Sequence, residues 1–176
     1  MHVPQDMSVG HPEGHLPLLA RCVHETESTK GPVLELGIGY GSTLVLKELC
    51  RDRELFSIES HQYWYDIFKG LESPNHRIIK VPNFNEIPVD RQWDIAFIDH
   101  GEFPARGPML QKLLGKAKFV VMHDSESTAY GYNSFLHLYK YRHDYKLYYP
   151  WTTVVSNEVD VSKWDFPIEQ GVHNKS

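Results

Sequence analysis

The sequence predicts a single-domain α/β fold with a mostly parallel β-sheet and helices on both faces. Two observations lead to this prediction. Short apolar runs alternate with segments of helical periodicity between residues 33 and 141, a pattern typical of parallel sheets whose strands are joined by crossover helices. The first apolar run ends in glycines at every second position and leads directly into a helix start at Ser42-Thr43, which is the local geometry of a nucleotide-binding loop.

The expected elements follow one another in order. Apolar residues at helical spacing predict an amphipathic helix over about 14–28, ahead of the first strand. Strands are expected at 33–36, 55–58, 77–81, 95–98 and 119–122, and helices at 42–50, 62–71, 104–114 and 134–141. Pro104 suits the first turn of its helix, where no backbone N–H is needed. Only Pro150-Trp151 separate the last two strands, 145–149 and 152–156, so this pair is expected to form an antiparallel hairpin.

Three regions are expected along the chain. Residues 1–29 form an N-terminal segment and helix, residues 30–157 the sheet domain that binds the ligand, and residues 158–176 a tail. His11 and His15 lie just before the first helix. They belong either to a lid over the ligand or to a flexible start, and their spacing is not that of metal ligands.

Composition limits the classes of function. A chain of 176 residues with 41% hydrophobic and 23% charged residues fits one globular domain. Its net charge of −5 lacks the basic excess of a general nucleic-acid binder. No apolar run approaches the roughly 20 residues that span a bilayer, and the N-terminus does not resemble a signal peptide. The two cysteines, Cys22 and Cys50, have no CxxC spacing, which favours a reduced, cytoplasmic protein.

Residues 139–151 combine aromatic and basic side chains. Such a stretch binds single-stranded nucleic acid in some proteins, but tyrosines on a helix end and an edge strand also form contacts between subunits. The acidic net charge favours the second interpretation. We therefore expect a homodimer contact, and neither a nucleic acid nor a membrane as partner.

Polar side chains follow the expected strands at the carboxyl ends, where ligands bind in open α/β sheets. Glu59 follows the second strand, Asp99-His100 the fourth and His123-Asp124 the fifth. Glu59 lies roughly 20 residues past the glycine loop, where an acid commonly accepts hydrogen bonds from the two ribose hydroxyls of an adenosine-containing ligand. The sequence therefore predicts a nucleoside site at this edge of the sheet.

The glycine spacing is Gly37-x-Gly39-x-Gly41, with Glu35 inside the preceding strand. A dinucleotide-binding loop has the spacing G-x-G-x-x-G, in which the backbone approaches a pyrophosphate. The spacing found here departs from that pattern and favours a ligand without a phosphate. A side chain at Gly37 or Gly39 is expected to keep the ligand away from the backbone.

Residues 35–42, Glu35-Leu36-Gly37-Ile38-Gly39-Tyr40-Gly41-Ser42, resemble the first motif of the class I S-adenosylmethionine (SAM) dependent methyltransferases. Asp94–His100 resembles that family's fourth-strand motif, Thr152–Ser156 its reversed seventh strand, and Glu59 its ribose-binding acid. Together these matches span residues 30–157. The resemblance implies a Rossmann-like methyltransferase fold with a seven-stranded sheet, an antiparallel last strand, and SAM as the cofactor.

The resemblance also implies which residues contact the cofactor. The glycine loop would contact its methionine part, Glu59 its ribose, and the loop at 83–85 its adenine. The implied set is Glu35, Gly37, Gly39, Gly41, Ser42, Thr43, Glu59, Asn83, Phe84 and Asp99.

The residues expected to carry catalysis are Asp99, His100, His123 and Asp124. Some small-molecule O-methyltransferases of this family hold a divalent metal with acids after the fourth and fifth strands, so Asp99 and Asp124 are candidate Mg²⁺ ligands. The sequence departs from that pattern, because Ser125 replaces an Asn after the second acid and Gly101-Glu102 replace a lysine-bearing segment. The alternative is an imidazole base, His100 or His123. Each of these could equally be a histidine that only hydrogen-bonds a loop.

The predicted function is SAM-dependent methyl transfer to a small molecule, at oxygen. The core fold occupies nearly the whole sequence and leaves no room for a large substrate domain. Two other classes of function stay open. One is a SAM-using lyase or cyclase on the same fold, since fold does not fix chemistry. The other is a nucleotide-binding module without catalysis.

Overall fold

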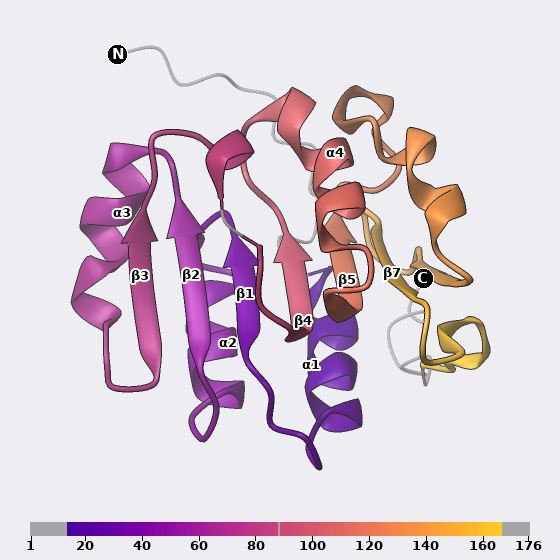
Figure 1. Cartoon of the computed structure of the whole chain (residues 1–176), viewed down its shortest axis with the longest axis horizontal. Helices are drawn as coiled ribbons and strands as arrows, with labels where there is room; N and C mark the ends of the chain where they lie inside the picture. Colours follow the sequence, from indigo (N-terminus) through magenta and orange to yellow (C-terminus); the bar gives the residue numbers. More distant parts are fainter. Residues whose placement is uncertain (1–13, 88, 167–176) are drawn as a thin grey trace, which may run out of the picture.

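The computed structural model of the chain describes residues 14–87 and 89–166. They form a seven-stranded sheet with the strand order β3-β2-β1-β4-β5-β7-β6 (Figure 1). The strands are β1 Val33–Leu36, β2 Leu55–Glu59, β3 His76–Lys80, β4 Trp93–Ile98, β5 Ala117–His123, β6 Tyr141–Tyr145 and β7 Thr152–Ser156.

The strand directions agree with the sequence prediction. β1 pairs in parallel with both β2 and β4. The pairing of β3 with β2 and that of β5 with β4 are also parallel. β7 lies antiparallel between β5 and β6. In this register Val33 of β1 lies opposite Leu55 on one side and Ile95 on the other. The expected seven-stranded, mostly parallel sheet with an antiparallel last strand is therefore confirmed.

Helices cover both faces of this sheet, as predicted. The helices are α1 Leu16–Glu25, α2 Thr43–Leu49, α3 Gln62–Phe68 and α4 Phe103–Leu113, and the 3₁₀ turns are η1 Lys69–Leu71, η2 Phe84–Glu86, η3 Thr128–Tyr130, η4 Tyr132–Ser134, η5 Leu136–Leu138 and η6 Val161–Lys163. Figure 1 shows α1 and α2 behind the sheet and α4 in front of it. Because side chains alternate along a strand, Val33 packs with α1 and α2, whereas Leu34 packs on the face that α4 covers.

Helix α1 shows how the sequence builds these cores. Leu18, Leu19, Cys22 and Val23 recur at helical spacing, and all four are buried. Burial of a leucine side chain contributes about 1.5–3 kcal/mol, so α1 is an integral part of the core. At the other end of the chain, Trp164 packs into the same core. The hydrophobic core thus includes residues before position 30 and after position 157, the expected limits of the sheet domain.

The segment after β5 differs from the prediction. The expected helix at 134–141 is wrong, because this region contains the short turns η4 and η5 and then β6. Pairing with β7 places Tyr141 opposite Ser156. The chain is already extended at Tyr139, so too few residues remain for a regular helix.

The predicted hairpin is confirmed as an antiparallel pair, but its first strand was placed too late in the sequence. Tyr145 pairs with Thr152, so the connection runs over residues 146–151 instead of two residues. The true strand alternates aromatic or histidine side chains with charged ones from Tyr141 to Tyr145.

Within the described ranges, no helix combines the length and apolar character that crossing a membrane requires.

Strands β1 and β4 approach each other closely just beyond their carboxyl ends, at Gly37. Its φ of +97° lies in the left-handed region, where a Cβ atom causes strain. A Cβ atom on Gly37 would lie 2.6 Å from the carbonyl oxygen of Asp99, whereas one on Gly39 would have nothing within 4 Å. The packing of the protein's own backbone therefore requires a glycine at position 37. Of these two glycines, only Gly39 has open space beside its backbone.

We expect Gly37→Ala to lower the free energy of unfolding by at least about 2 kcal/mol, because the added methyl group meets rigid backbone at a positive φ. Gly39→Ala is the matched control and should change this free energy by less than about 0.5 kcal/mol. Urea unfolding followed by circular dichroism measures both. Equal stabilities of the two variants would contradict the packing role of Gly37.

Candidate active site

A cleft of about 510 Å³ opens beyond the carboxyl ends of β1, β2 and β4. Figure 1 shows the arrowheads of these three strands at the same edge of the sheet. The lining residues are Gly37, Ile38, Gly39, Glu59, Ser60, His61, Trp64, Asp99, His100, Gly101 and Glu102. The volume falls within the range of small-molecule sites, and the position is the one at which open α/β sheets bind ligands.

The carboxylate of Glu59 is fixed at the end of β2 by two backbone groups. The N–H of Ile38 donates to Oε2 at 3.0 Å, and the N–H of His61 donates to Oε1 at 2.6 Å. Each carboxylate oxygen has a further lone pair. Glu59 can therefore accept two more hydrogen bonds from a ligand in the cleft without losing its support.

Glu35 lies beneath the glycine loop and is fully buried. Its carboxylate accepts hydrogen bonds from the hydroxyls of Ser42, at 2.6 Å, and Thr43, at 2.9 Å, and from that of Ser57. Thr43 Oγ1 in turn accepts from the N–H of Gly39 at 3.0 Å. Burial raises the pKa of Glu35 to about 7 despite the three hydroxyl donors. This carboxyl group anchors the loop from below.

The predicted cofactor residues occupy different positions around the cleft. Four of them line it: Gly37, Gly39, Glu59 and Asp99. Glu35, Ser42 and Thr43 form the hydrogen-bonded support below, and Gly41 lies in the turn between β1 and α2. The loop is thus built in two layers, one that faces the cleft and one that holds the first in place.

Asn83 and Phe84, predicted near the adenine, do not belong to the lining residues. The side chain of Asn83 accepts a hydrogen bond from the N–H of Asn85 at 3.0 Å and so caps η2. Phe84 is fully buried, and its ring stacks on that of His100 with 4.0 Å between centroids and 10° between planes. Phe84 therefore supports the wall of the cleft through His100.

Two carboxylates meet at the ends of β4 and β5, on either side of one guanidinium. Arg106 of α4 donates from Nη2 to Asp99 Oδ1 at 3.2 Å and from Nη1 to Asp124 Oδ2 at 3.0 Å. The Arg106 side chain is buried, and its Nε donates to the carbonyl of His100. Asp124 itself has a φ of +53°, a strained conformation of the kind that clusters at functional sites.

Arg106 lies where the sequence predicted a Mg²⁺ ion between the two acids. The guanidinium already supplies positive charge, and its N–H groups occupy the facing oxygens of Asp99 and Asp124. The residues at this position therefore do not fit a Mg²⁺ ion held by these two carboxylates.

The two candidate imidazole bases have opposite environments. His100 is buried, and burial together with the nearby charge of Arg106 lowers its pKa to about 3. His123 is also buried, but the hydrogen bond to Asp99 and the charges of both carboxylates outweigh burial and raise its pKa. His123 Nδ1 lies 3.3 Å from Asp99 Oδ1. His123 is therefore the more basic of the two imidazoles.

Two polar residues of this region, Arg106 and His15, are buried. The sequence prediction places His15 only in a lid or a flexible start and assigns no role to Arg106. Both continue an apolar helical stripe by one position. Arg106 precedes Met109, Leu110 and Leu113, and His15 precedes Leu18, Leu19 and Cys22, each at spacings of three, four and seven residues. A polar residue at such a position points into the protein interior, and this signal would have found both.

No protein-family model matches the sequence, and no curated protein does. Solved structures nevertheless match the fold. A protein from Klebsiella pneumoniae assigned as an O-methyltransferase has a TM-score of 0.58 at 15% identity, over 88% of this chain and 82% of that one. The N-methyltransferase NodS from Bradyrhizobium japonicum WM9 has a TM-score of 0.54 at 9% identity, over 84% and 98%. The N-terminal domain of human METTL16, solved with SAH, has a TM-score of 0.51 at 10% identity, over 89% and 75%.

The chain has the fold of the class I SAM-dependent methyltransferases. Arg106, Asp99, Asp124 and His123 form a cluster, the Arg106 cluster. In this methyltransferase fold the cleft and the Arg106 cluster lie at the same edge of the sheet and share Asp99. Identities of 9–15% support the fold alone. The neighbours include both an O- and an N-methyltransferase, so the acceptor has to be inferred from the site.

The raised pKa of Glu35 predicts a pH-dependent contribution to stability. Between its ordinary pKa of 4.5 and its folded pKa of about 7, the folded protein retains a proton that the unfolded chain has lost. The stability contributed by Glu35 therefore falls as the pH rises through this window. The difference in unfolding free energy between wild type and Glu35→Gln should decrease by about 2 kcal/mol or more between pH 5 and pH 8.

Urea unfolding of both proteins at each pH measures this difference. The comparison removes contributions that the two proteins share, such as that of His76, whose pKa burial lowers to about 4. That lowered pKa acts in the opposite direction, because it makes the folded state less stable as the pH falls below 6.5. A difference that is independent of pH would show that Glu35 is ionised in the folded protein.

Proposed function

We propose that this protein transfers a methyl group from SAM to an oxygen atom of a small-molecule acceptor. The carboxylate of Glu59 is the main support. It is held at the cleft by two backbone N–H groups, and the space over Gly39 beside it is open. A fixed carboxylate with two available oxygens suits the vicinal hydroxyls of a ribose.

The rest of the cleft fits the remaining parts of SAM. Gly39 leaves its backbone accessible to the methionine part, and Ile38 and Trp64 give the cleft apolar walls. Bound SAM would supply an electrophilic methyl group on its sulfonium. A neighbour with the same fold, human METTL16, was solved with SAH, the product that SAM leaves after methyl transfer.

The Arg106 cluster suits the acceptor side of the reaction. Transfer forms a bond between the acceptor oxygen and the methyl carbon, breaks the bond between that carbon and sulfur, and requires the acceptor hydroxyl to lose a proton. Asp99 lines the cleft and also holds His123, so the acceptor hydroxyl is expected in the cleft beside Asp99. We place the loss of the proton at the Asp99–His123 pair, because the low pKa of His100 makes that residue unsuitable.

The small-molecule acceptor follows from the enclosed position of this cluster and from the net charge of −5, which does not favour nucleic acid. The homodimer contact at residues 139–151 and the cytoplasmic location remain predictions. A lyase or cyclase that uses SAM and a binding module without catalysis are the competing functions.

Glu59→Ala should weaken SAM binding by about 1–3 kcal/mol, because the ribose hydroxyls lose their acceptor. Glu59→Gln should lose less, since it keeps one acceptor oxygen. Isothermal calorimetry with SAM measures both, and Glu48→Ala, at an exposed position of α2, is the control. Unchanged SAM affinity in Glu59→Ala would mean that the ribose lies elsewhere.

Product analysis tests the reaction itself. The protein is incubated with SAM and a panel of phenols, carboxylic acids and sugars, and the nucleoside product is identified by mass spectrometry. We expect SAH, and an at least tenfold slower turnover in Asp99→Asn and Asp124→Asn, roughly 1.4 kcal/mol of barrier. Methylthioadenosine would instead indicate a lyase or cyclase, and intact SAM with every acceptor would indicate a binding module.

A further inference from the structure

His15 occupies a buried position that neither the fold nor methyl transfer explains. It lies at the N-terminal end of α1, is 2% exposed, and makes no side-chain capping bond. Its ring centroid lies 5.1 Å from that of Phe97, and the ring meets that of His123 edge-on with 4.9 Å between centroids. Helix α1 therefore brings a second imidazole against the Asp99–His123 pair.

Three ring nitrogens at this point have no hydrogen-bond partner among the described residues. They are Nδ1 and Nε2 of His15 and Nε2 of His123. A buried polar atom without a partner is costly, and natural proteins rarely leave one unless a ligand, ion or water completes the site. The carboxylate of Asp99 lies at the same point, and imidazoles together with a carboxylate make a common metal-binding set.

We propose that His15, Asp99 and His123 bind a divalent transition-metal ion such as Zn²⁺. One potential ligand atom from each residue lies within 4.8 Å of those of the other two. With metal–ligand bonds of about 2.0–2.2 Å, the side chains have to close in by about 1 Å around an ion. Three protein ligands leave a fourth position open, which is the arrangement of catalytic zinc sites.

The donor set selects the kind of ion. Two imidazole nitrogens and one carboxylate oxygen suit Zn²⁺, Co²⁺ and similar ions, whereas Mg²⁺ prefers oxygen ligands throughout. This site therefore differs in both ligands and ion from the Mg²⁺ site that the sequence suggested between the two acids. Asp99 is the one residue that the two sites would share.

The local charges permit an additional cation. Asp99 and Asp124 carry two negative charges against the single guanidinium of Arg106. Arg106 also pairs with Asp124 at 3.0 Å, so it has a carboxylate partner besides Asp99.

The ion can bind whether or not the protein is a methyltransferase, but the role given to the ion rests on the proposed function. Because Asp99 also lines the cleft, the ion would lie beside the cleft, and its open position would be the place for an acceptor hydroxyl. The ion would lower the pKa of that hydroxyl, its proton would leave to water, and the oxygen would attack the methyl carbon as the carbon–sulfur bond breaks. His123 would then serve as a ligand and not as a base.

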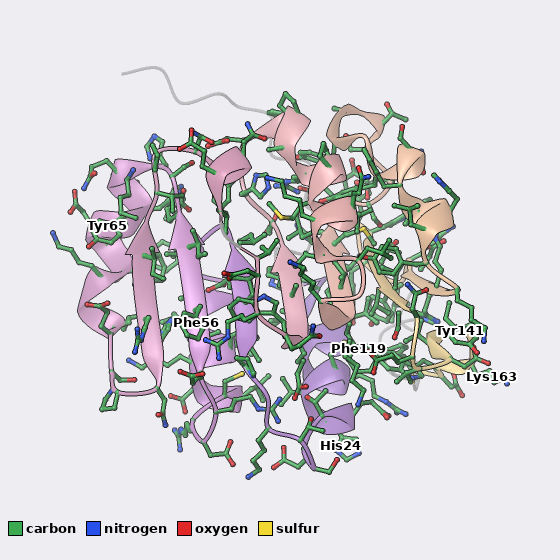
Figure 2. The ribbon with its side chains drawn as sticks, in the orientation of Figure 1. His24, Phe56, Tyr65, Phe119, Tyr141 and Lys163 are labelled. Carbon is green, nitrogen blue, oxygen red and sulfur yellow. The ribbon has the colours of Figure 1, made fainter. Side chains whose placement is uncertain are left out.

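Titration with Co²⁺, without SAM, tests the site. The full chain is dialysed against a chelator, and Co²⁺ binding is followed by its visible absorption and by calorimetry. We expect one tightly bound ion per chain, and affinities at least about tenfold weaker in His15→Gln and Asp99→Asn. His24→Gln is the matched control, because His24 lies in the same helix but is exposed at its other end, as Figure 2 shows.

Two results would overturn the proposal. One is a wild-type protein that binds no Co²⁺, and the other is unchanged binding in both His15→Gln and Asp99→Asn. Thermal unfolding checks that each variant is folded. If His15→Gln does not fold, the Co²⁺ affinity of Asp99→Asn, which preserves side-chain volume, tests the site. SAM calorimetry is a separate measurement, so failure of the metal site and failure of the methyltransferase proposal give different patterns.

Discussion

The buried guanidinium of Arg106 is the interaction on which the functional edge of this protein depends. It joins three elements, because α4 provides the arginine, β4 leads to Asp99 and β5 leads to Asp124. Removing one partner of a buried ion pair leaves an uncompensated charge and costs about 3–5 kcal/mol. Arg106 therefore fixes the direction of Asp99, and Asp99 in turn belongs to the cleft, to the pair with His123 and to the proposed metal site.

The cofactor side of the edge uses two glutamates in different environments. Glu35 is sealed beneath the loop with three hydroxyl donors, so its pKa is raised and its task is support. Glu59 is held by backbone N–H groups at the cleft, and its oxygens retain capacity for a ligand. Residue type is the same in both cases, and the depth at which each strand presents its side chain separates the two roles.

The histidines at this edge follow the same rule. His100 is packed flat against Phe84, next to a guanidinium, and its imidazole stays neutral. His123 is equally enclosed but has a carboxylate partner, which reverses the effect of burial on its pKa. His15 has neither a partner nor exposure. A neutral imidazole is the state in which histidine binds metal ions, which is why the place of His15 beside His123 and Asp99 has consequences for function.

The sequence by itself determined the sheet, the glycine loop and the acids that follow β2, β4 and β5, because these depend on local periodicity and on the rule that parallel strands end at one edge. It misplaced β6, since pairing with β7 sets that register over a distance that local patterns do not encode. Only the tertiary structure decided that Arg106 lies between the two acids and that His15 meets His123. Both residues are marked in the sequence as polar members of apolar helical stripes, but the partner of such a residue depends on which surface its helix packs against.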